Sequence, residues 1–201
     1  MMIRDARPDE YKKIAQLHEE VFPGFFMTSL GMDYLKGHYK AVLKYPDTIC
    51  LVAENDGDLC GYVIGRANAK NGLKKVIKAY PFHFAILGLK LLFKKPSSLI
   101  RVIKNITKKR DDNTVHDDQN YSEIGLIGVL PEMKRTGVGH KLFEAFCEKA
   151  VAKGAKRVSL TTDYYDNDLV LTSYRNWGFK EYYVFTAYPE RKMYRLIKDF
   201  S

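Results

Sequence analysis

Hydrophobic residues recur at helical spacing soon after the start of the chain. Ile14, Leu17 and Val21 fall three and four positions apart, so they share one face of a helix. Pro8 suits the first turn of such a helix, because the N–H that proline lacks would have no partner there. Pro23, which glycine follows, ends the pattern. These residues predict one amphipathic helix between the two prolines.

A second helix and a β-hairpin are expected next. Residues 30–43 repeat the helical pattern, and Thr28 or Ser29 is the expected N-cap because either hydroxyl can accept a hydrogen bond from a free helix amide. Residues 48–53 and 59–65 have the composition of strands and flank the turn sequence Asn-Asp-Gly-Asp. Two such runs around a tight turn are typical of a hairpin.

The second half of the chain alternates between strand-like and helix-like patterns. Runs of strand length and composition occupy residues 122–130, 157–162, 181–188 and 193–197. Helical patterns separate them at residues 140–153 and 168–176. No internal repeat is visible. This order of elements predicts an α/β protein with a mixed sheet.

The uneven distribution of charge changes how the basic composition is interpreted. The 201 residues include 33 Lys or Arg and 24 Asp or Glu, which gives a net charge of +9. Residues 70–110 hold 12 of the basic side chains and no acidic one, so the remaining 21 basic and 24 acidic groups leave the rest at −3. The basic segment has helical patterns broken at Pro81 and Pro96. We therefore expect one domain over residues 1–201, with a basic helical insertion at about residues 70–120.

Cysteine content and hydropathy argue against several protein classes. Cys50, Cys60 and Cys147 are an odd number without C-x-x-C spacing, which disfavours a disulfide framework and a metal site. Buried thiols in a reducing compartment are expected instead, although Cys50 and Cys60 could face each other across strands. The N-terminus lacks the apolar region of a signal peptide, and the most apolar window, residues 79–93, is too short to span a bilayer. A cytoplasmic protein is expected.

An anion-binding pattern follows the strand that ends near Val129. The chain turns through two glycines and at once begins an amphipathic helix, whose first amides have no partner and carry partial positive charge. Glycines let an anion approach the backbone closely, and two cationic side chains precede them, so a pyrophosphate suits the site. The alternative is an ordinary glycine-bearing turn. Residues of the pattern are Lys134, Arg135, Thr136, Gly137, Val138, Gly139 and His140.

Two motifs resemble those of a known family. Lys134-x-x-Gly137-x-Gly139 resembles the acyl-CoA signature of the GNAT superfamily of N-acetyltransferases, usually Gln/Arg-x-x-Gly-x-Gly/Ala, with Lys as the departure. Asn167, Tyr174 seven residues later and then Gly-Phe are similar to the family's later motif. The resemblance implies a mixed, mostly antiparallel central sheet flanked by helices.

The resemblance also implies where acetyl-CoA binds as co-substrate. Its pyrophosphate would lie on the amides of residues 135–140, and its pantetheine arm would run beside Ile127, Gly128 and Val129, held partly by Asn167. A backbone N–H near Val129 would hold the thioester oxygen. No metal is implied.

Candidates for the proton transfers follow from the same resemblance. Tyr174 would protonate the leaving thiolate, since a phenol with a pKa near 10 suits that step. Glu123, at the start of the signature strand, is the candidate base, acting directly or through water, with a structural carboxylate as the alternative. Asp163 is held in reserve. Three histidines are expected to be incidental: His83, His116 and His140.

The basic insertion admits three interpretations. It could be a lid whose cations meet an anionic acceptor such as a nucleotide-linked amino sugar. It could lie on anionic lipid as a peripheral membrane contact. It could also be a cover that packs on the sheet or on a second subunit, in a homodimer. Nucleic acid is not an expected partner, because aromatic residues do not interleave with the cations.

Together these features predict an N-acetyltransferase that moves an acetyl group from acetyl-CoA to a primary amine of a small molecule. The alternatives are a protein or peptide N-acetyltransferase and a non-catalytic acyl-CoA-binding protein. The basic insertion disfavours a basic peptide acceptor, and the retention of Tyr174, Glu123 and both glycines disfavours loss of catalysis.

Overall fold

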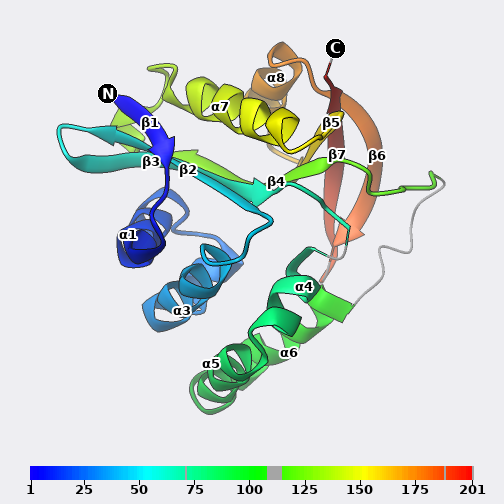
Figure 1. Ribbon diagram of the computed structural model, residues 1–201. Coiled ribbons are helices and arrows are strands. Elements are labelled where there is room, and N and C mark those ends of the chain that lie inside the picture. The colour runs from blue at the N-terminus through cyan, green and yellow to red at the C-terminus, as the bar shows by residue number, and fades with distance from the viewer. Residues whose placement is uncertain (71, 108–114, 188, 201) are drawn as a thin grey trace.

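The computed structural model describes residues 1–70, 72–107, 115–187 and 189–200, and it is built on one mixed β-sheet (Figure 1). The sheet has seven strands in the order β1-β2-β3-β4-β5-β7-β6. Only β4 and β5 are parallel neighbours, and every other adjacent pair is antiparallel. The predicted α/β fold with a mostly antiparallel sheet is therefore confirmed. The strands are β1 (Met2–Asp5), β2 (Thr48–Asn55), β3 (Asp58–Arg66), β4 (Ser122–Val129), β5 (Arg157–Asp163), β6 (Lys180–Ala187) and β7 (Arg191–Asp199).

Helices cover both faces of the sheet (Figure 1). One face carries α7 (Val138–Ala152) and α8 (Asp168–Asn176), and the other carries α1 (Tyr11–Val21) and α3 (Met32–Val42). Short turns connect them: η1 (Pro8–Glu10), α2 (Phe26–Ser29) and η2 (Pro131–Met133). Each face has its own hydrophobic cluster, because the strands alternate their side chains between the two.

The start of α3 differs from the predicted one. Thr28 and Ser29 lie inside α2, where their hydroxyls donate to the Phe22 and Phe26 carbonyls. Gly31 is the residue before α3, with a φ of 92° that L side chains rarely adopt. The predicted Thr28 or Ser29 cap is wrong, because the sequence contains an extra helical turn before this glycine.

The basic segment forms three helices between β3 and β4. These are α4 (Gly72–Ala79), α5 (Pro81–Lys94) and α6 (Pro96–Thr107), and both prolines begin helices as their chemistry favours. Of the expected loop at residues 111–120, residues 111–114 lie outside the described part, and residues 115–120 form neither helix nor strand.

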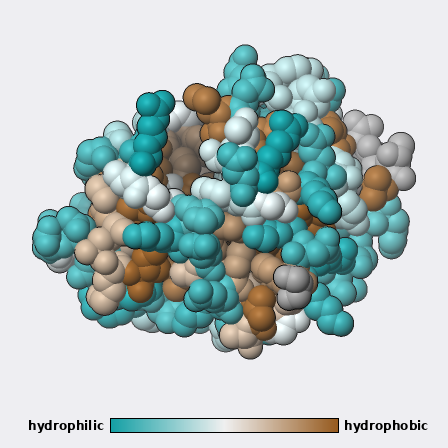
Figure 2. All heavy atoms as spheres, turned by 90° about the horizontal axis from the view of Figure 1, so that it is seen from above, coloured by the Kyte–Doolittle hydropathy of each residue, from teal (hydrophilic) through white to brown (hydrophobic). Residues whose placement is uncertain are grey.

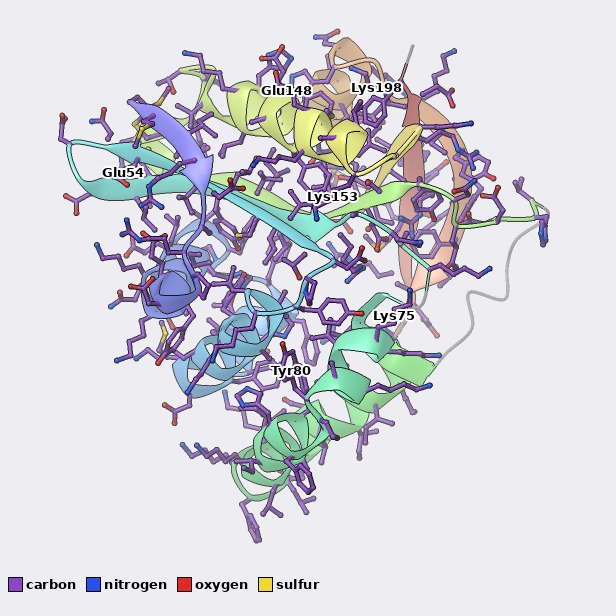
Figure 3. All side chains as sticks on the ribbon, in the orientation of Figure 1. Glu54, Lys75, Tyr80, Glu148, Lys153 and Lys198 are labelled. Carbon is purple, nitrogen blue, oxygen red and sulfur yellow. The ribbon has the colours of Figure 1, made fainter. Side chains whose placement is uncertain are left out.

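Contacts to α3 hold this segment against the rest of the protein. Leu87 occupies the space that a side chain at Gly37 would need, and the Gly37 carbonyl lies 2.7 Å from Nε2 of His83. The Tyr80 hydroxyl, labelled in Figure 3, donates to the Lys44 carbonyl, two residues after the end of α3. Contacts in the middle of α3 and just after its end therefore fix where the basic helices lie.

No single helix in the described ranges is long and apolar enough to cross a membrane. The pair α4 and α5 together meets the length and composition criterion, but the two helices are bent by 102° at their junction. The cysteines agree with the expected thiols: Cys50 and Cys60 are buried and free, and Cys147 is half-buried and free.

A buried polar network links α1, α3 and β3. Nδ1 of His18 lies 2.8 Å from the hydroxyl oxygens of Tyr39 and Tyr62, which are 2.9 Å from each other. All three side chains are fully buried. Burial lowers the pKa of His18 to about 4, because the apolar surroundings penalise the charged imidazolium.

We expect this burial to make folding stability fall as the pH falls. Between pH 6.5 and about 4 the unfolded chain takes up a proton at residue 18 that the folded chain does not, so stability is lost through that range. The loss reaches about 3 kcal/mol, at about 1.4 kcal/mol for each pKa unit. Urea unfolding between pH 4.5 and 8 measures it. Burial also lowers the pKa of His38 to about 4, so His18→Gln should reduce the pH slope without abolishing it, and the exposed His116→Gln should leave it unchanged. Equal pH slopes for the two variants would contradict the role of His18.

Candidate active site

The central feature of the candidate site is the point where β4 and β5 separate. The two strands pair in parallel only from Ser122 with Val158 to Ile124 with Leu160. Beyond Ile124, β4 continues along β3 alone, whereas β5 continues along β7 as far as Asp163. A register shift beside Gly65 marks the place where β4 changes course. The sheet is therefore split at its centre, and the β5-facing edge of residues 126–129 is open to a ligand.

A loop with exposed amides lies at the end of β4. The first helical hydrogen bond of α7 runs from the Lys141 N–H to the Gly137 carbonyl, so the amides before it have no partner within the helix. Gly137 precedes α7 in the left-handed region with a φ of 84°, and Arg135 also has a positive φ of 65°. The structure begins this helix at Val138, two residues before the predicted start, so the amides of Val138, Gly139 and His140 belong to its first turn.

The two glycines of the loop leave space beside these amides. A Cβ on Gly137 would meet nothing within 4 Å, and a Cβ on Gly139 would meet only Trp177, at 3.9 Å. Packing within the protein therefore does not require glycine at position 139. Lys134, Arg135 and Thr136 are exposed around the same turn. An anionic group such as a pyrophosphate fits this arrangement of amides, space and cations.

Aromatic side chains form the wall next to the loop. Trp177 stacks on Phe143 at 5.0 Å between ring centroids and lies 5.4 Å from the ring of His140. Lys198 of β7 donates to the carbonyl of Trp177, the residue that follows α8, and its ammonium group lies over the Phe143 ring (Figure 3). Figure 2 looks down on this face of the protein and shows hydrophobic patches between hydrophilic side chains. The sequence alone did not assign a role to Trp177, although this residue stands directly before the Gly-Phe pair of the later motif.

Tyr174 lies at the edge of the same cluster. Its ring packs edge-on against Trp177 and Phe179, and it contacts the cluster that Ile127 and Val129 also border. Burial raises the pKa of Tyr174 to about 12, because the phenolate would be poorly solvated there. Within the described ranges, no hydrogen bond involves its hydroxyl. The phenol therefore keeps its proton at neutral pH and can donate it.

Asn167 is held at the end of β5. Its Nδ2 donates to the Thr162 hydroxyl at 2.6 Å and to the Asp163 carbonyl at 3.0 Å. These two bonds use both amide protons, so Oδ1 is the group that remains for a ligand. The residue thus fixes the turn between β5 and α8 beside the split in the sheet.

Glu123 lies between two arginines. One carboxylate oxygen accepts from Arg195 at 2.7 Å, and the other accepts from Arg66 on the neighbouring strand. The Arg195 side chain is 1% exposed and Glu123 12%. Arg195 also contacts the Ser159 hydroxyl and the ring of Tyr121. A carboxylate with both oxygens occupied is well suited to hold the strands together.

We expect Glu123→Gln to destabilise the protein by about 3 kcal/mol, because it leaves the guanidinium of Arg195 buried without a counter-charge. Chemical denaturation measures the free energy of unfolding, with Glu148→Gln on the exposed side of α7 as control (Figure 3). A direct base would give another result: turnover would fall by 100-fold or more while the free energy of unfolding changed little. That outcome would assign the proton transfer to Glu123.

The remaining candidates have partners of their own. Both carboxylate oxygens of Asp163 accept from Arg191. His83 contacts the Gly37 carbonyl, and His140 lies 3.6 Å from Glu144. Among the described residues, no group of three or more His, Cys, Asp or Glu side chains is arranged to hold a metal ion.

The residues that pack beneath the separation of β4 and β5 were not predicted from the sequence. A side chain on Gly128 would collide with Val21 and Phe22, so the end of α1 lies directly under this part of β4. The ring of Phe22 lies 5.2 Å from that of buried His18. Glycine in a strand is a signal of close approach, but the approaching residues are more than 100 positions away in the sequence.

A sheet split between its parallel strands, with an uncapped helix N-terminus beside the split, is an arrangement that can hold a phosphate-bearing ligand. The chain belongs to the acetyltransferase (GNAT) family, which it matches over residues 11–179. It is an acetyl-CoA-dependent N-acetyltransferase, and enzymes of this family act on amine acceptors. None of the curated proteins compared with it matches the chain.

Solved structures share the fold of this chain. An aminoglycoside 6′-acetyltransferase type Ii is 12% identical with a TM-score of 0.63, covering 99% of this chain and 97% of that one. The ribosomal-protein-alanine N-acetyltransferase from Brucella melitensis is 12% identical with a TM-score of 0.62, over all of both chains. A GNAT acetyltransferase from Streptococcus pneumoniae is 15% identical with a TM-score of 0.59, over 99% of both. Such low identities establish the fold alone.

Proposed function

We propose that this enzyme acetylates a primary amine of a small, anionic molecule, such as a nucleotide-linked amino sugar, by direct transfer. The proposal treats residues 1–201 as one acyl-CoA N-acyltransferase domain with a basic insertion at about residues 70–120. The observation that carries it is that three features of the site lie next to one another. The open edge of β4, the uncapped start of α7 and the Tyr174 ring all adjoin one hydrophobic cluster.

Each predicted binding residue has a role in this arrangement. The amides of residues 135–140 and the cations Lys134 and Arg135 would hold the pyrophosphate of acetyl-CoA. The open edge at Ile127, Gly128 and Val129 would pair with the pantetheine arm, and Oδ1 of Asn167 would accept from it. The support is that β4 pairs here with β3 alone and that both loop glycines have free space beside them.

The reaction requires two proton movements around one bond exchange. Acetyl-CoA supplies an acetyl thioester, whose carbonyl carbon the neutral amine can attack. The new carbon–nitrogen bond forms as the carbon–sulfur bond breaks, and Tyr174 donates its phenolic proton to the sulfur. The amine gives up a proton in turn. Glu123 remains the carboxylate proposed for that step, through water, although its two arginine partners favour a structural role.

Arginines near the end of α1 support an anionic acceptor. The guanidinium of Arg101 on α6 lies 4.2 Å from the ring centroid of Phe26. The guanidinium of Arg191 at the start of β7 lies 5.9 Å from the ring of Phe25, but it already pairs with Asp163, so Arg101 is the main support. These phenylalanines follow the residues that pack under Gly128, so the cations border the face of β4 opposite α7. A negatively charged acceptor fits there better than a basic peptide does.

The test is to incubate the purified protein with acetyl-CoA and a panel of amines while following free thiol and product mass. Nucleoside-diphosphate-linked amino sugars should be acetylated faster than lysine peptides, N-terminal peptides or uncharged amino sugars. Preference for a peptide would replace the proposal with a protein N-acetyltransferase. Tight binding of CoA without turnover on any amine would indicate a non-catalytic acyl-CoA-binding protein.

A further inference from the structure

Helix α5 is hydrophobic on its packed side and on its outward side. Leu87 and Leu91 are buried toward the rest of the protein. On the opposite side, four large side chains recur at spacings of four, three and four residues and form one stripe, here called the outer stripe. They are exposed by 86%, 57%, 55% and 80%, respectively: Phe82, Ile86, Leu89 and Phe93.

The helix that follows extends this hydrophobic surface. Ile100 and Ile103 of α6 are 55% and 51% exposed, and α6 lies beside α5 (Figure 1). A helix with apolar side chains on two opposite sides normally has both of them covered. Exposed apolar side chains gathered in this way mark a site of contact with another body.

Cations border the outer stripe. Lys90 is one turn from both Ile86 and Phe93, and Lys94 follows one turn later on the same flank. Both lysines are exposed, although Lys94 also pairs with Asp33 of α3. The sequence from residue 59 to residue 110 contains no Asp or Glu. The surface therefore combines apolar side chains with positive charge.

We propose that α5 lies in the interface of an anionic lipid bilayer, with the outer stripe inserted among the acyl chains. Interfacial helices carry an apolar side that enters the headgroup boundary, with Lys or Arg on the flanks that meet anionic headgroups. The 102° bend between α4 and α5 fits a helix that lies in the plane of the membrane and does not cross it. The sheet and the candidate active site then remain on the side of α5 away from the lipid (Figure 1).

Charge favours lipid over a second copy of this chain. A two-fold dimer joins the same surface of both subunits. The outer stripes would then meet with Lys90 of one copy close to Lys90 of the other, and the segment has no acidic residue to compensate them, because Asp33 of α3 already pairs with Lys94. Anionic headgroups supply the missing negative charge.

The test measures co-sedimentation of the full chain with vesicles of phosphatidylcholine alone or with 30% phosphatidylglycerol. We expect binding to the anionic vesicles that is at least tenfold tighter than binding to neutral ones, and weaker in 0.5 M salt. Phe82→Ser combined with Phe93→Ser should lower binding at least tenfold. Lys90→Glu combined with Lys94→Glu, at the two lysines that border the outer stripe, should remove the preference for anionic vesicles.

The control replaces two other exposed hydrophobic residues, on the other face of the sheet. Val151 on α7 and Leu169 on α8 are 50% and 80% exposed, and their double serine variant should bind vesicles as the wild type does. Unchanged circular dichroism and melting temperature check that each variant is folded. Equal binding of wild type and the Phe82/Phe93 variant would overturn the proposal. So would a wild-type dimer in sedimentation that this variant abolishes, without any vesicle binding.

Discussion

Replacing Tyr174 by Phe is expected to lower the rate of acetyl transfer by about 100- to 10,000-fold, whereas acetyl-CoA should still bind. The substitution removes only the hydroxyl, which makes no hydrogen bond among the described residues. The ring keeps its edge-on contacts with Trp177 and Phe179. What is lost is the proton that the departing sulfur would receive.

Single-turnover kinetics with pre-bound acetyl-CoA measure the chemical step directly, and calorimetry measures the affinity for acetyl-CoA. Tyr11→Phe, at the start of α1, is the matched control and should retain the wild-type rate. Because burial raises the pKa of Tyr174 to about 12, the wild-type rate should show no loss from tyrosine ionisation below about pH 11. An unchanged single-turnover rate in Tyr174→Phe would contradict the assignment.

The second large effect is expected at Gly139. Gly139→Leu should weaken the binding of acetyl-CoA by about 10- to 100-fold, because the new side chain would occupy the space next to the first amides of α7. Each charge-assisted hydrogen bond lost there costs about 1.5–3 kcal/mol, which corresponds to that range. The fold should tolerate the change, since the nearest atom to the new Cβ is Trp177 at 3.9 Å. Leucine also favours a helix by about 1 kcal/mol over glycine.

Titration of acetyl-CoA by calorimetry, together with the melting temperature, separates loss of binding from loss of folding. Gly88→Leu is the control, because Gly88 is also a helical glycine whose Cβ would meet nothing within 4 Å. It should leave the affinity for acetyl-CoA unchanged. If Gly139→Leu binds acetyl-CoA as tightly as the wild type, the phosphates do not lie on this turn.

Local chemistry made much of the fold predictable. The hairpin around Asn-Asp-Gly-Asp, the breaks in the helical segment at Pro81 and Pro96 and the bounds of α8 follow from turn residues and hydrophobic spacing. The start of α3 could not be predicted in this way. Gly31, with its positive φ, precedes the helix in place of the hydroxyl residues two and three positions earlier. Capping depends on backbone geometry, which neighbouring packing decides.

For the site, the sequence by itself determined the parts that are contiguous in the chain. The loop from Lys134 to His140 and the segment from Asn167 to Phe179 carry their chemistry in local spacing, so the family could be predicted and a place for acetyl-CoA proposed. Only the tertiary structure decided what surrounds each charged or aromatic side chain. Glu123 meets arginines 57 and 72 residues away, and Trp177 forms the wall beside Gly139. Such contacts arise from strand pairing and packing between distant segments, and a side chain's role depends on those partners as much as on its own chemistry.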